Sequence, residues 1–367
     1  MSYDIVNTGT TMGTGALPGI SSSRVSSNSS RLGLKAANEI GGGWSVPWQL
    51  EATVGTDTGA TGGVGTSAGT PSRSARLLDR NTYVGLSGAD MGKLLFGRHD
   101  TPYKISTRKL DVFADGIADN RSLMGTTLLG GAGGMVTETF DARLSDMIAY
   151  FSPNMDGFSA AIAYANLTEN NTSTKQKRVN SLSLAAMYEL DPVYASFAYE
   201  VHTTFASLVD STAVKAVKLG FGYRMDFIDL GFAYEKSIDD LGNVDAVTAA
   251  NPCGGMSVGA NCSGHGTFYW SGKINFSATD ALKMAYSKAG QAGTASDGTG
   301  AYQFTFGFNH DFNERTSMYL LSTLLKNDKR VSYGLSNAAS SGAYSVNASS
   351  TGGAAPSAYS FGVKHSF

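Results

Sequence analysis

The sequence predicts an all-β protein, a transmembrane antiparallel β-barrel of about sixteen strands. Three observations predict this fold: an aromatic alternation that runs to the last residue, connections that are short and long in turn, and a mean hydropathy of −0.11. Barrel strands with one apolar and one polar face average to neutral hydropathy. A membrane helix needs a long apolar run, and the chain contains none.

The closing segment of the chain, residues 358–367, carries the first of these observations. Its apolar side chains fall on one face and its small or charged side chains on the other, which is the period of two of a strand. The alternative is the last strand of a soluble sandwich, but soluble proteins rarely leave an aromatic strand at a sheet edge. A closed barrel has no edges, and lipid favours an aromatic outer face. The residues of this face are Tyr359, Phe361, Val363, His365 and Phe367.

Composition excludes several classes of function. The net charge of −2 gives no basis for nucleic-acid binding, and the 16% of charged residues is low for a soluble surface. The two cysteines, Cys253 and Cys262, predict one loop disulfide in an oxidising compartment. With His265 as the one further candidate nearby, a metal site there lacks ligands. The chain starts without the basic and apolar segments of a signal peptide, so we expect none in this sequence.

The strands are expected in the following order. A short strand over 2–7 and a Gly/Ser/Thr-rich loop over 8–30 precede the first hairpin, and Pro47 marks an irregularity in that hairpin. The hairpins are 31–39 with 44–54, 80–88 with 92–98, 141–151 with 158–166, 180–190 with 193–204, 214–225 with 227–237, 265–276 with 281–290, and 301–312 with 315–325, before the final strand.

The connections decide between a barrel and a sandwich. Turns inside the hairpins are short, whereas long segments lie at about 55–78, 99–138, 238–264 and 326–357. A soluble sandwich has no reason to lengthen every second connection, but the two rims of a membrane barrel face different compartments. Strand 301–312 shows the expected faces, with aromatic residues toward lipid and Gln303, Thr305 and Asn309 toward a water-filled interior. The aromatic-face residues are Tyr302, Phe304, Phe306, Phe308, His310 and Phe312.

Four motifs in register resemble the general diffusion porins of the Gram-negative outer membrane, especially those of beta-proteobacteria. They are SRLGLK at 30–35, DRNTYVGLSG with LFGR at 79–98, DARLSDMIAYFSPNMDGFSA at 141–160, and the closing GVKHSF at 362–367. The resemblance implies one barrel domain over the whole chain, with segment 99–138 folded inward as a constriction loop. Two departures stand out: the first strand looks clipped, and the constriction loop lacks the compact acidic motif of the enteric members.

The same resemblance implies the partners and the location. It predicts a homotrimer in the outer membrane, in contact with lipid and lipopolysaccharide. It also predicts that the outer-membrane assembly machinery recognises the C-terminal strand through Tyr359, Phe361, His365 and Phe367.

The charged residues of the pore are also assigned by this resemblance. At matching positions of similar porins, Arg31, Arg80 and Arg143 line one wall of the constriction, with Arg98 and Lys35 as weaker additions. Guanidinium groups stay charged, so a cluster of them needs water, anions or facing carboxylates. Alternatively, these arginines are ordinary rim charges in weak surface pairs. The candidate facing carboxylates are Asp111, Asp115 and Asp119, spaced by four, although the same spacing also fits one solvated face of a short helix.

We therefore expect a channel for passive diffusion of ions and small hydrophilic solutes, which is neither an enzyme nor dependent on a cofactor. The five histidines are scattered, and no nucleophile elbow or phosphate-binding loop is present. The alternative is a plugged structural or adhesive barrel whose long loops bind a partner. The arginine wall favours a modest preference for anions, but the lysines and arginines of segment 99–138 leave the selectivity open.

Overall fold

The fold is that of a computed structural model, which describes residues 1–11, 18–57, 78–125, 140–166, 180–204, 212–239, 265–291, 298, 300–329, 331–335, 345–346 and 352–367. Cys253 and Cys262 lie outside the described residues, so the disulfide stays a prediction. The described part contains no helix with the length and apolar character needed to cross a membrane.

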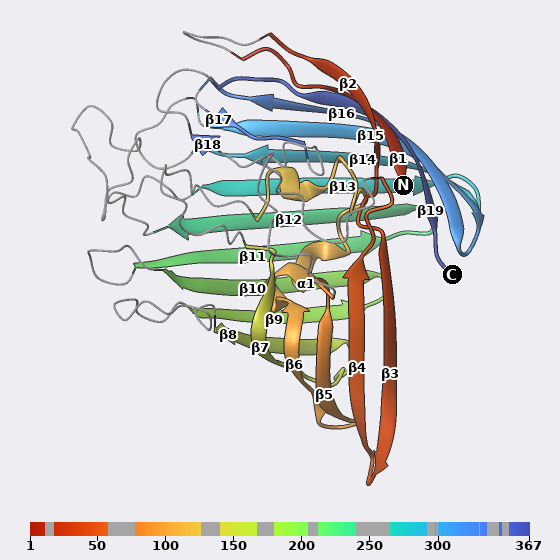
Figure 1. Cartoon of the computed structure of the whole chain (residues 1–367), viewed down its shortest axis with the longest axis vertical. Coiled ribbons are helices and arrows are strands. Elements are labelled where there is room, and N and C mark those ends of the chain that lie inside the picture. Colours follow the sequence, from red (N-terminus) through yellow and green to blue (C-terminus); the bar gives the residue numbers. More distant parts are fainter. Residues whose placement is uncertain are drawn as a thin grey trace.

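A sheet of seventeen strands forms almost all of the described structure (Figure 1). Beside it lie only the pair β17 (Val331–Ser332) and β18 (Ser345–Val346), helix α1 (Pro102–Arg108) and a 3-10 turn (Asn120–Ser122) among the described elements. The strands of the sheet are β1 Ser2–Asn7, β2 Ser21–Ser26, β3 Arg31–Gly41, β4 Trp44–Thr53, β5 Thr82–Gly88, β6 Gly92–Asp100, β7 Arg143–Phe151, β8 Phe158–Asn166, β9 Asn180–Leu190, β10 Val193–Thr204, β11 Thr212–Arg224, β12 Ile228–Asp239, β13 Gly266–Asn275, β14 Asp280–Ala289, β15 Ala301–Asn313, β16 Thr316–Asn327 and β19 Ser357–His365.

The order of pairing carries the sheet from β3 round to β1 and β2, the strands that precede β3 in the chain. Each strand from β3 to β16 pairs antiparallel with the next; β16 pairs with β19, β19 with β1, and β1 with β2. The two end strands, β2 and β3, are joined by residues 27–30 only. Because strand direction alternates around the sheet, β2 and β3 run in the same direction. If β2 and β3 are counted as one interrupted strand, the sheet has sixteen strands instead of seventeen, as predicted.

One expectation in this region is wrong: segment 8–30 contains strand β2 rather than a loop alone. The sequence of β2, SSSRVS, lacks an apolar alternation, so its composition suggests a loop. The strand forms because all six of its residues pair with β1. Long-range pairing has therefore overridden weak local preference.

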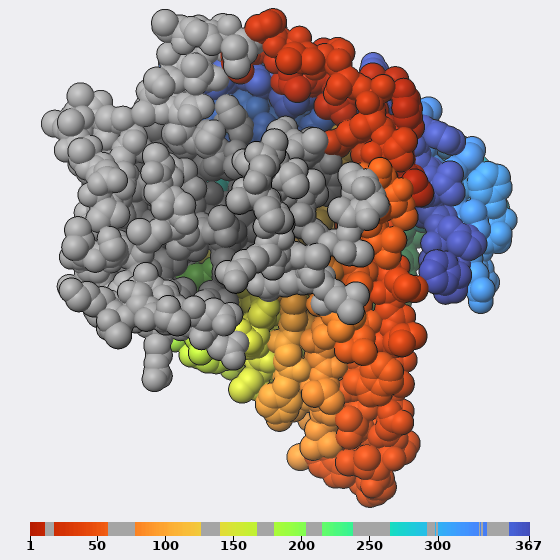
Figure 2. Space-filling model, viewed as in Figure 1, coloured from red at the N-terminus to blue at the C-terminus, as the bar shows by residue number. Residues whose placement is uncertain are grey.

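A buried carboxylate joins the first and last strands. Asp4 on β1 accepts hydrogen bonds from the hydroxyls of Ser2 (2.7 Å), Ser26 on β2 (2.5 Å) and Ser360 on β19 (2.6 Å). The ammonium of Met1 donates to the carbonyl of Val363 at 2.8 Å. These contacts connect residues from opposite ends of the chain, and Figure 2 shows the two ends side by side on the surface.

The two faces of the wall differ as the alternation predicts. On β15 and β19, Phe304, Phe306 and Phe361 are 43%, 44% and 50% exposed, so they point outward rather than into a packed centre. Their neighbours Gln303 and Thr305 are buried inside the ring. The inner face is hydrogen-bonded, since Thr305 and Gln303 both contact the Thr323 hydroxyl on β16. The wall thus has an apolar skin and a polar lining.

Two segments fold into the ring. The first follows β6 and contains α1, which contacts β9, β10 and β11 (Figure 1). The second is part of the connection after β16: Val331, Tyr333 and Leu335 are buried in one apolar cluster with Leu123 and Met124 of the first segment. The described part of the connection expected at 326–357 therefore packs against the first segment.

Glycines on the inner face allow the first segment to approach the wall. A Cβ at Gly307 of β15 would lie 2.9 Å from the ring of Phe113, and one at Gly231 of β12 would lie 3.1 Å from the carbonyl oxygen of Leu110. These are tighter than ordinary contacts, so a larger residue would push the segment into the interior. The segment thus lies against the β11–β15 wall and leaves the rest of the interior for a passage.

We expect Phe306→Arg to destabilise the membrane-inserted barrel by about 2–4 kcal/mol, because an arginine in the middle of β15 would face hydrocarbon. The matched control is Asn309→Arg on the inner face of the same strand, where Asp311 can pair with the new charge. Urea unfolding in lipid bilayers measures both. Equal losses in the two variants would contradict the assignment of the faces.

Candidate functional site

The first inward segment, residues 101–125, is here called the inner loop. Its helix α1 begins because the Thr101 hydroxyl caps it, accepting from the Lys104 N–H at 3.3 Å, and because Pro102 suits the first helical position. Arg108 lies in the last turn, where a cation is favourable, and the helix ends at Lys109. The chain then turns back on itself through residues 110–122.

A network of charges holds this turn together. The Arg108 guanidinium contacts Asp115 at 2.8 Å and Asp119 at 2.7 Å, and Arg121 contacts Asp119 at 2.9 Å. Burial by itself would raise the pKa of Asp119, but Arg121 and Arg108 outweigh it and hold that pKa well below its usual range. The acidic series of the loop is therefore largely neutralised by arginines of the same loop.

Asp111 has a different environment from the other two carboxylates. Its oxygens accept hydrogen bonds from the backbone N–H groups of Phe113 and Asn120 and from the Tyr269 hydroxyl on β13, each at 2.9 Å. Burial and the negative charge of Asp119 nevertheless raise the pKa of Asp111 to about 6. This carboxyl therefore titrates in a range that is accessible to experiment.

Glu235 on β12 fixes both ends of the inner loop to the wall. Its carboxylate accepts from the Tyr103 hydroxyl at 2.8 Å and from the Gly125 N–H at 2.7 Å. Lys218 on β11 lies 3.1 Å from Glu235 and 2.5 Å from Asp141, which lies just beyond the loop. All of these groups are buried, and a buried charge is tolerated only when it is paired in this way. We call Glu235, Lys218, Asp141 and Tyr103 the clamp.

Across the interior lie the three arginines that the sequence grouped together, here called the basic wall: Arg31, Arg80 and Arg143. Glu51 on β4 lies 3.4 Å from Arg31 and 3.3 Å from Arg80, so it bridges them. The pKa of Arg80 is lowered by burial and by the positive charges of Arg143 and Arg31. The negative charge of Glu51 raises this pKa in part. The three guanidiniums are thus electrostatic neighbours, and they remain charged.

The basic wall meets the inner loop at one point. Arg31 lies 3.9 Å from Asp115, which is the one of the three predicted carboxylates in contact with the wall. Arg143 contacts Asp100 at 3.0 Å, and Lys104 of α1 contacts the same carboxylate at 2.7 Å. The two sides of the passage are therefore joined through shared acids.

The two weaker candidates lie apart from this contact. Arg98 donates to the Asp79 carbonyl at 2.7 Å and to the Ser145 hydroxyl at 2.8 Å, so it connects neighbouring strands. Lys35 is exposed on β3.

Ion pairs around the passage join six cations to five carboxylates, which leaves one positive charge in excess. Such a ring can orient polar solutes and favour anions, because fixed charges in a narrow passage act directly on what passes. In the described part of the chain, no three His, Cys, Asp or Glu side chains are placed to hold a metal ion. The cations are Arg31, Arg80, Lys104, Arg108, Arg121 and Arg143, and the acids are Glu51, Asp100, Asp111, Asp115 and Asp119.

Comparison with known protein families identifies this architecture. Residues 5–330 match the family model described as Gram-negative porin, which is most of the chain. This chain belongs to the Gram-negative porin family. It is therefore an outer-membrane diffusion channel, and the members of its family are channels rather than enzymes.

Individual relatives agree with this assignment. The porin is 24% identical to outer membrane porin protein 32 of Delftia acidovorans over 316 residues, which are 84% of this chain and 77% of that protein. Its fold is similar to that of an anion-selective porin from Comamonas acidovorans, with a TM-score of 0.72, 21% identity, and coverage of 100% and 98% of the two chains. Salmonella typhi OmpF, solved in complex with daunomycin, gives a TM-score of 0.60 at 13% identity, with 99% and 96% covered.

Several residues of the porin's passage were not singled out from the sequence. Glu51 could have been found, because it lies opposite Gly33 on the hairpin and so shares the inner face with Arg31. Glu235 and Lys218 face each other across neighbouring strands, where they are also in register. Their contact with Tyr103 and Gly125 carries no sequence signal, because the loop and the wall are far apart in the chain.

The C-terminal residues of the porin lie where the alternation predicts. Tyr359 is 64% exposed on the outer face, as is Phe361 at 50%, and the terminal Phe367 is 89% exposed. His365 contacts the Thr316 hydroxyl at 3.0 Å, which ties the last strand to the start of β16. Their part in assembly stays a prediction.

We expect Glu235→Ala to raise single-channel conductance, because the inner loop loses its anchor at both ends. Breaking a buried ion pair costs roughly 3 kcal/mol, and Tyr103 loses its partner as well. Conductance in planar bilayers and the size limit for sugars in liposome swelling measure the change. Glu314→Ala, in an exposed turn, serves as the control. Unchanged conductance in Glu235→Ala would show that the loop is held by other contacts.

Acidification should favour anions in this channel. Because Asp111 has its pKa raised to about 6, it loses its negative charge as the pH falls from 7.5 to 5. A unit charge about 10 Å away in water is worth on the order of 0.4 kcal/mol, with opposite sign for an anion and a cation, so the anion-to-cation permeability ratio should rise about fourfold. Reversal potentials in a salt gradient measure this ratio. Asp111→Asn, which keeps an acceptor oxygen, should remove the change, and any part that persists belongs to other groups.

Proposed function

We propose that this porin is an open, water-filled channel for ions and small hydrophilic solutes, and that it prefers anions. The observation that carries the proposal is the basic wall, where Arg31 and Arg80 share the single carboxylate of Glu51. The one further acid near Arg31 among the described residues, Asp115, is shared with Arg108 and Arg121 of the inner loop, so a positive field remains on that side of the passage. The inner loop does not cancel this field, because residues 101–125 carry four lysines and arginines against three aspartates.

The loop and the wall together suit passive selection. The clamp holds the loop at a set distance from the wall, so the loop limits the size of the solutes that pass. The charged groups of the two sides act on the orientation of polar solutes and disfavour apolar ones. Neither step consumes energy or forms a covalent bond. The similarity to a porin described as anion-selective supports the sign of the preference.

The assembly that we propose is a homotrimer in the outer membrane, surrounded by lipid and lipopolysaccharide. The exposed aromatic face of the wall supports contact with lipid. We propose as well that the assembly machinery recognises the C-terminal strand through the residues that face outward there. Single-channel recordings test the oligomer, because a trimer of independent pores closes in three equal steps.

The triple variant Arg31→Gln, Arg80→Gln, Arg143→Gln tests the selectivity. Three unit charges about 10 Å from a passing ion contribute on the order of 1 kcal/mol through water, with opposite sign for an anion and a cation, so the anion-to-cation permeability ratio should fall about thirtyfold. Reversal potentials in a potassium chloride gradient measure this ratio. Arg315→Gln, in an exposed turn, is the control and should leave the ratio unchanged. If the triple variant keeps the ratio of the unmodified porin, the basic wall is not what passing ions meet.

Liposome swelling with small sugars separates this function from the alternative of a plugged barrel whose loops bind a partner. Swelling at rates that fall with sugar size supports the open channel. Liposomes that contain the folded protein and stay impermeable would favour the plugged barrel.

A further inference from the structure

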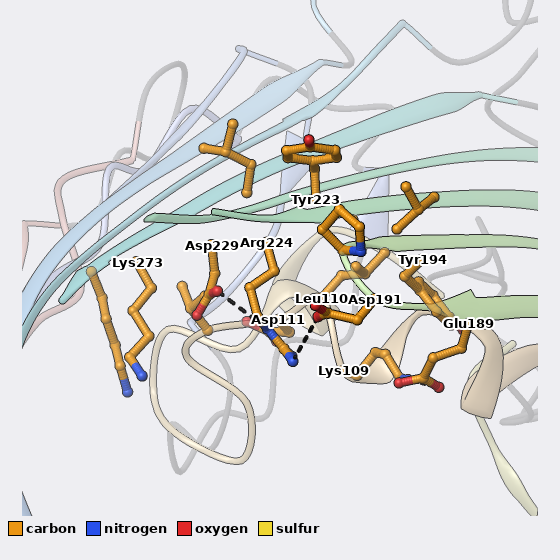
Figure 3. A pocket seen from close by; sticks show the side chains of 16 residues that line it. Lys109, Leu110, Asp111, Glu189, Asp191, Tyr194, Tyr223, Arg224, Asp229 and Lys273 are labelled. Carbon is orange, nitrogen blue, oxygen red and sulfur yellow. Dashed lines mark hydrogen bonds and ion pairs between the residues drawn. The ribbon is translucent and has the colours of Figure 1, made fainter. Parts of the chain in front are cut away.

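A cavity of about 430 Å³ lies between the inner loop and the rim of short turns (Figure 3). Its walls come from the turn between β9 and β10, from the ends of β11 and β12 beside their turn, and from β13 and β14 where they approach their connection. Leu110 and Val112 of the inner loop close it on one side. It is thus a chamber beside the short turns, and none of the three arginines of the basic wall lines it.

The charged side chains of this chamber fall into two groups. In the first, each cation already has a carboxylate partner. Lys109 pairs with Glu189, and Arg224 lies between Asp191 at 3.6 Å and Asp229 at 3.5 Å, as the dashed lines of Figure 3 mark. These two cations and three carboxylates satisfy one another and leave one negative charge over.

The second group is Lys273 on β13 and Lys283 on β14, which have no such partner. Among the described residues, neither ammonium lies within 4.0 Å of a carboxylate, and Lys283 donates to the neutral amide oxygen of Asn309 at 3.3 Å. The two lysines are directly opposite each other in the register of their strands, where like charges repel. Lys364 on β19 is a further positive neighbour of Lys283, whereas Asp311 and Asp111 are negative neighbours beyond ion-pair distance.

Both lysines face the interior. Lys273 is on the same face of β13 as the buried Tyr269 and Ser271, and Lys283 is on the same face of β14 as the buried Ala285 and Ser287. Two half-buried ammonium groups therefore lie side by side, and the carboxylates of the chamber lie more than 4.0 Å from both among the described residues. An anion bound between the two ammonium groups would offset their mutual repulsion.

We propose that Lys273 and Lys283 form a binding site for a small oxyanion that carries two negative charges, of the class of inorganic phosphate and short dicarboxylates. A divalent oxyanion offers oxygens to both ammonium groups at once and cancels both charges, whereas chloride would cancel one. The site retains such solutes after they have passed the inner loop. In this respect it rests on the proposed function, because it names the class of solute that the channel favours.

The test uses inorganic phosphate and the full-length protein in detergent. Isothermal titration calorimetry should show one phosphate bound per chain. Lys273→Gln with Lys283→Gln should weaken binding at least about tenfold, and Lys273→Arg with Lys283→Arg should retain it. The matched control is Lys288→Gln, because Lys288 is on the same strand as Lys283 but on the exposed outer face. Either no binding by the unmodified protein or equal binding by the double glutamine variant would overturn the site.

A second measurement keeps this inference distinct from the proposed function. In planar bilayers, phosphate added on the short-turn side should reduce the chloride current of the unmodified porin and of Lys288→Gln, and it should do so only weakly in the double glutamine variant. Chloride current without any effect of phosphate would overturn the site and leave the channel function standing. Phosphate binding by a protein that never conducts would support the site and overturn the open channel.

Discussion

The whole architecture depends on one constraint, that a backbone in lipid must find all of its hydrogen-bond partners within the protein. A sheet meets this constraint when it returns to its own first strand, because a free edge would leave a row of unpaired groups. In this porin the return occurs at the seam where β19 pairs with β1 and β1 with β2, whereas β3 pairs with β4 alone among the described strands. There Asp4 accepts hydrogen bonds from serine hydroxyls on three strands, and the Met1 ammonium donates to the Val363 carbonyl of β19. The seam is therefore joined by side chains as well as by the backbone ladder.

Once the ring is formed, its interior becomes a place where charge can be buried. Lys218, Glu235 and Asp141 would be costly in an apolar core, yet here they pair with one another and with the ends of the inner loop. Polar contacts of this kind are directional, so they fix the position of the loop more closely than apolar packing alone. The opposite side carries guanidiniums with too few acids. On one side of the passage the clamp fixes the inner loop, and on the other side the basic wall carries an excess of positive charge.

The alternation of side chains predicts most of this wall. Strand β15 was expected over 301–312 and spans Ala301–Asn313, because a strand with one lipid face and one water face repeats every second residue. Strand β2 was missed, because its serines carry no such signal and its pairing with β1 decides its structure. Local pattern is informative here only where one face must be apolar.

The interior was harder to predict, for a physical reason. Asp111, Asp115 and Asp119 are evenly spaced in the chain, but their surroundings differ. Asp111 accepts from backbone N–H groups, Asp115 reaches the basic wall, and Asp119 contacts two arginines. The fold of the loop separates them, and that fold depends on distant residues such as Glu235. The grouping of Arg31, Arg80 and Arg143 came from resemblance, and the structure places them as electrostatic neighbours around Glu51.

The second inward segment has a mechanical consequence. Tyr333 and Leu335 are buried in the same apolar cluster as Leu123 and Met124 of the inner loop, and the Tyr333 backbone is bound to the Asn327 amide at 2.8 and 3.0 Å. A displacement of this segment is therefore transmitted to the inner loop through direct packing. Insertions or bulky tags placed close to it would therefore alter conduction.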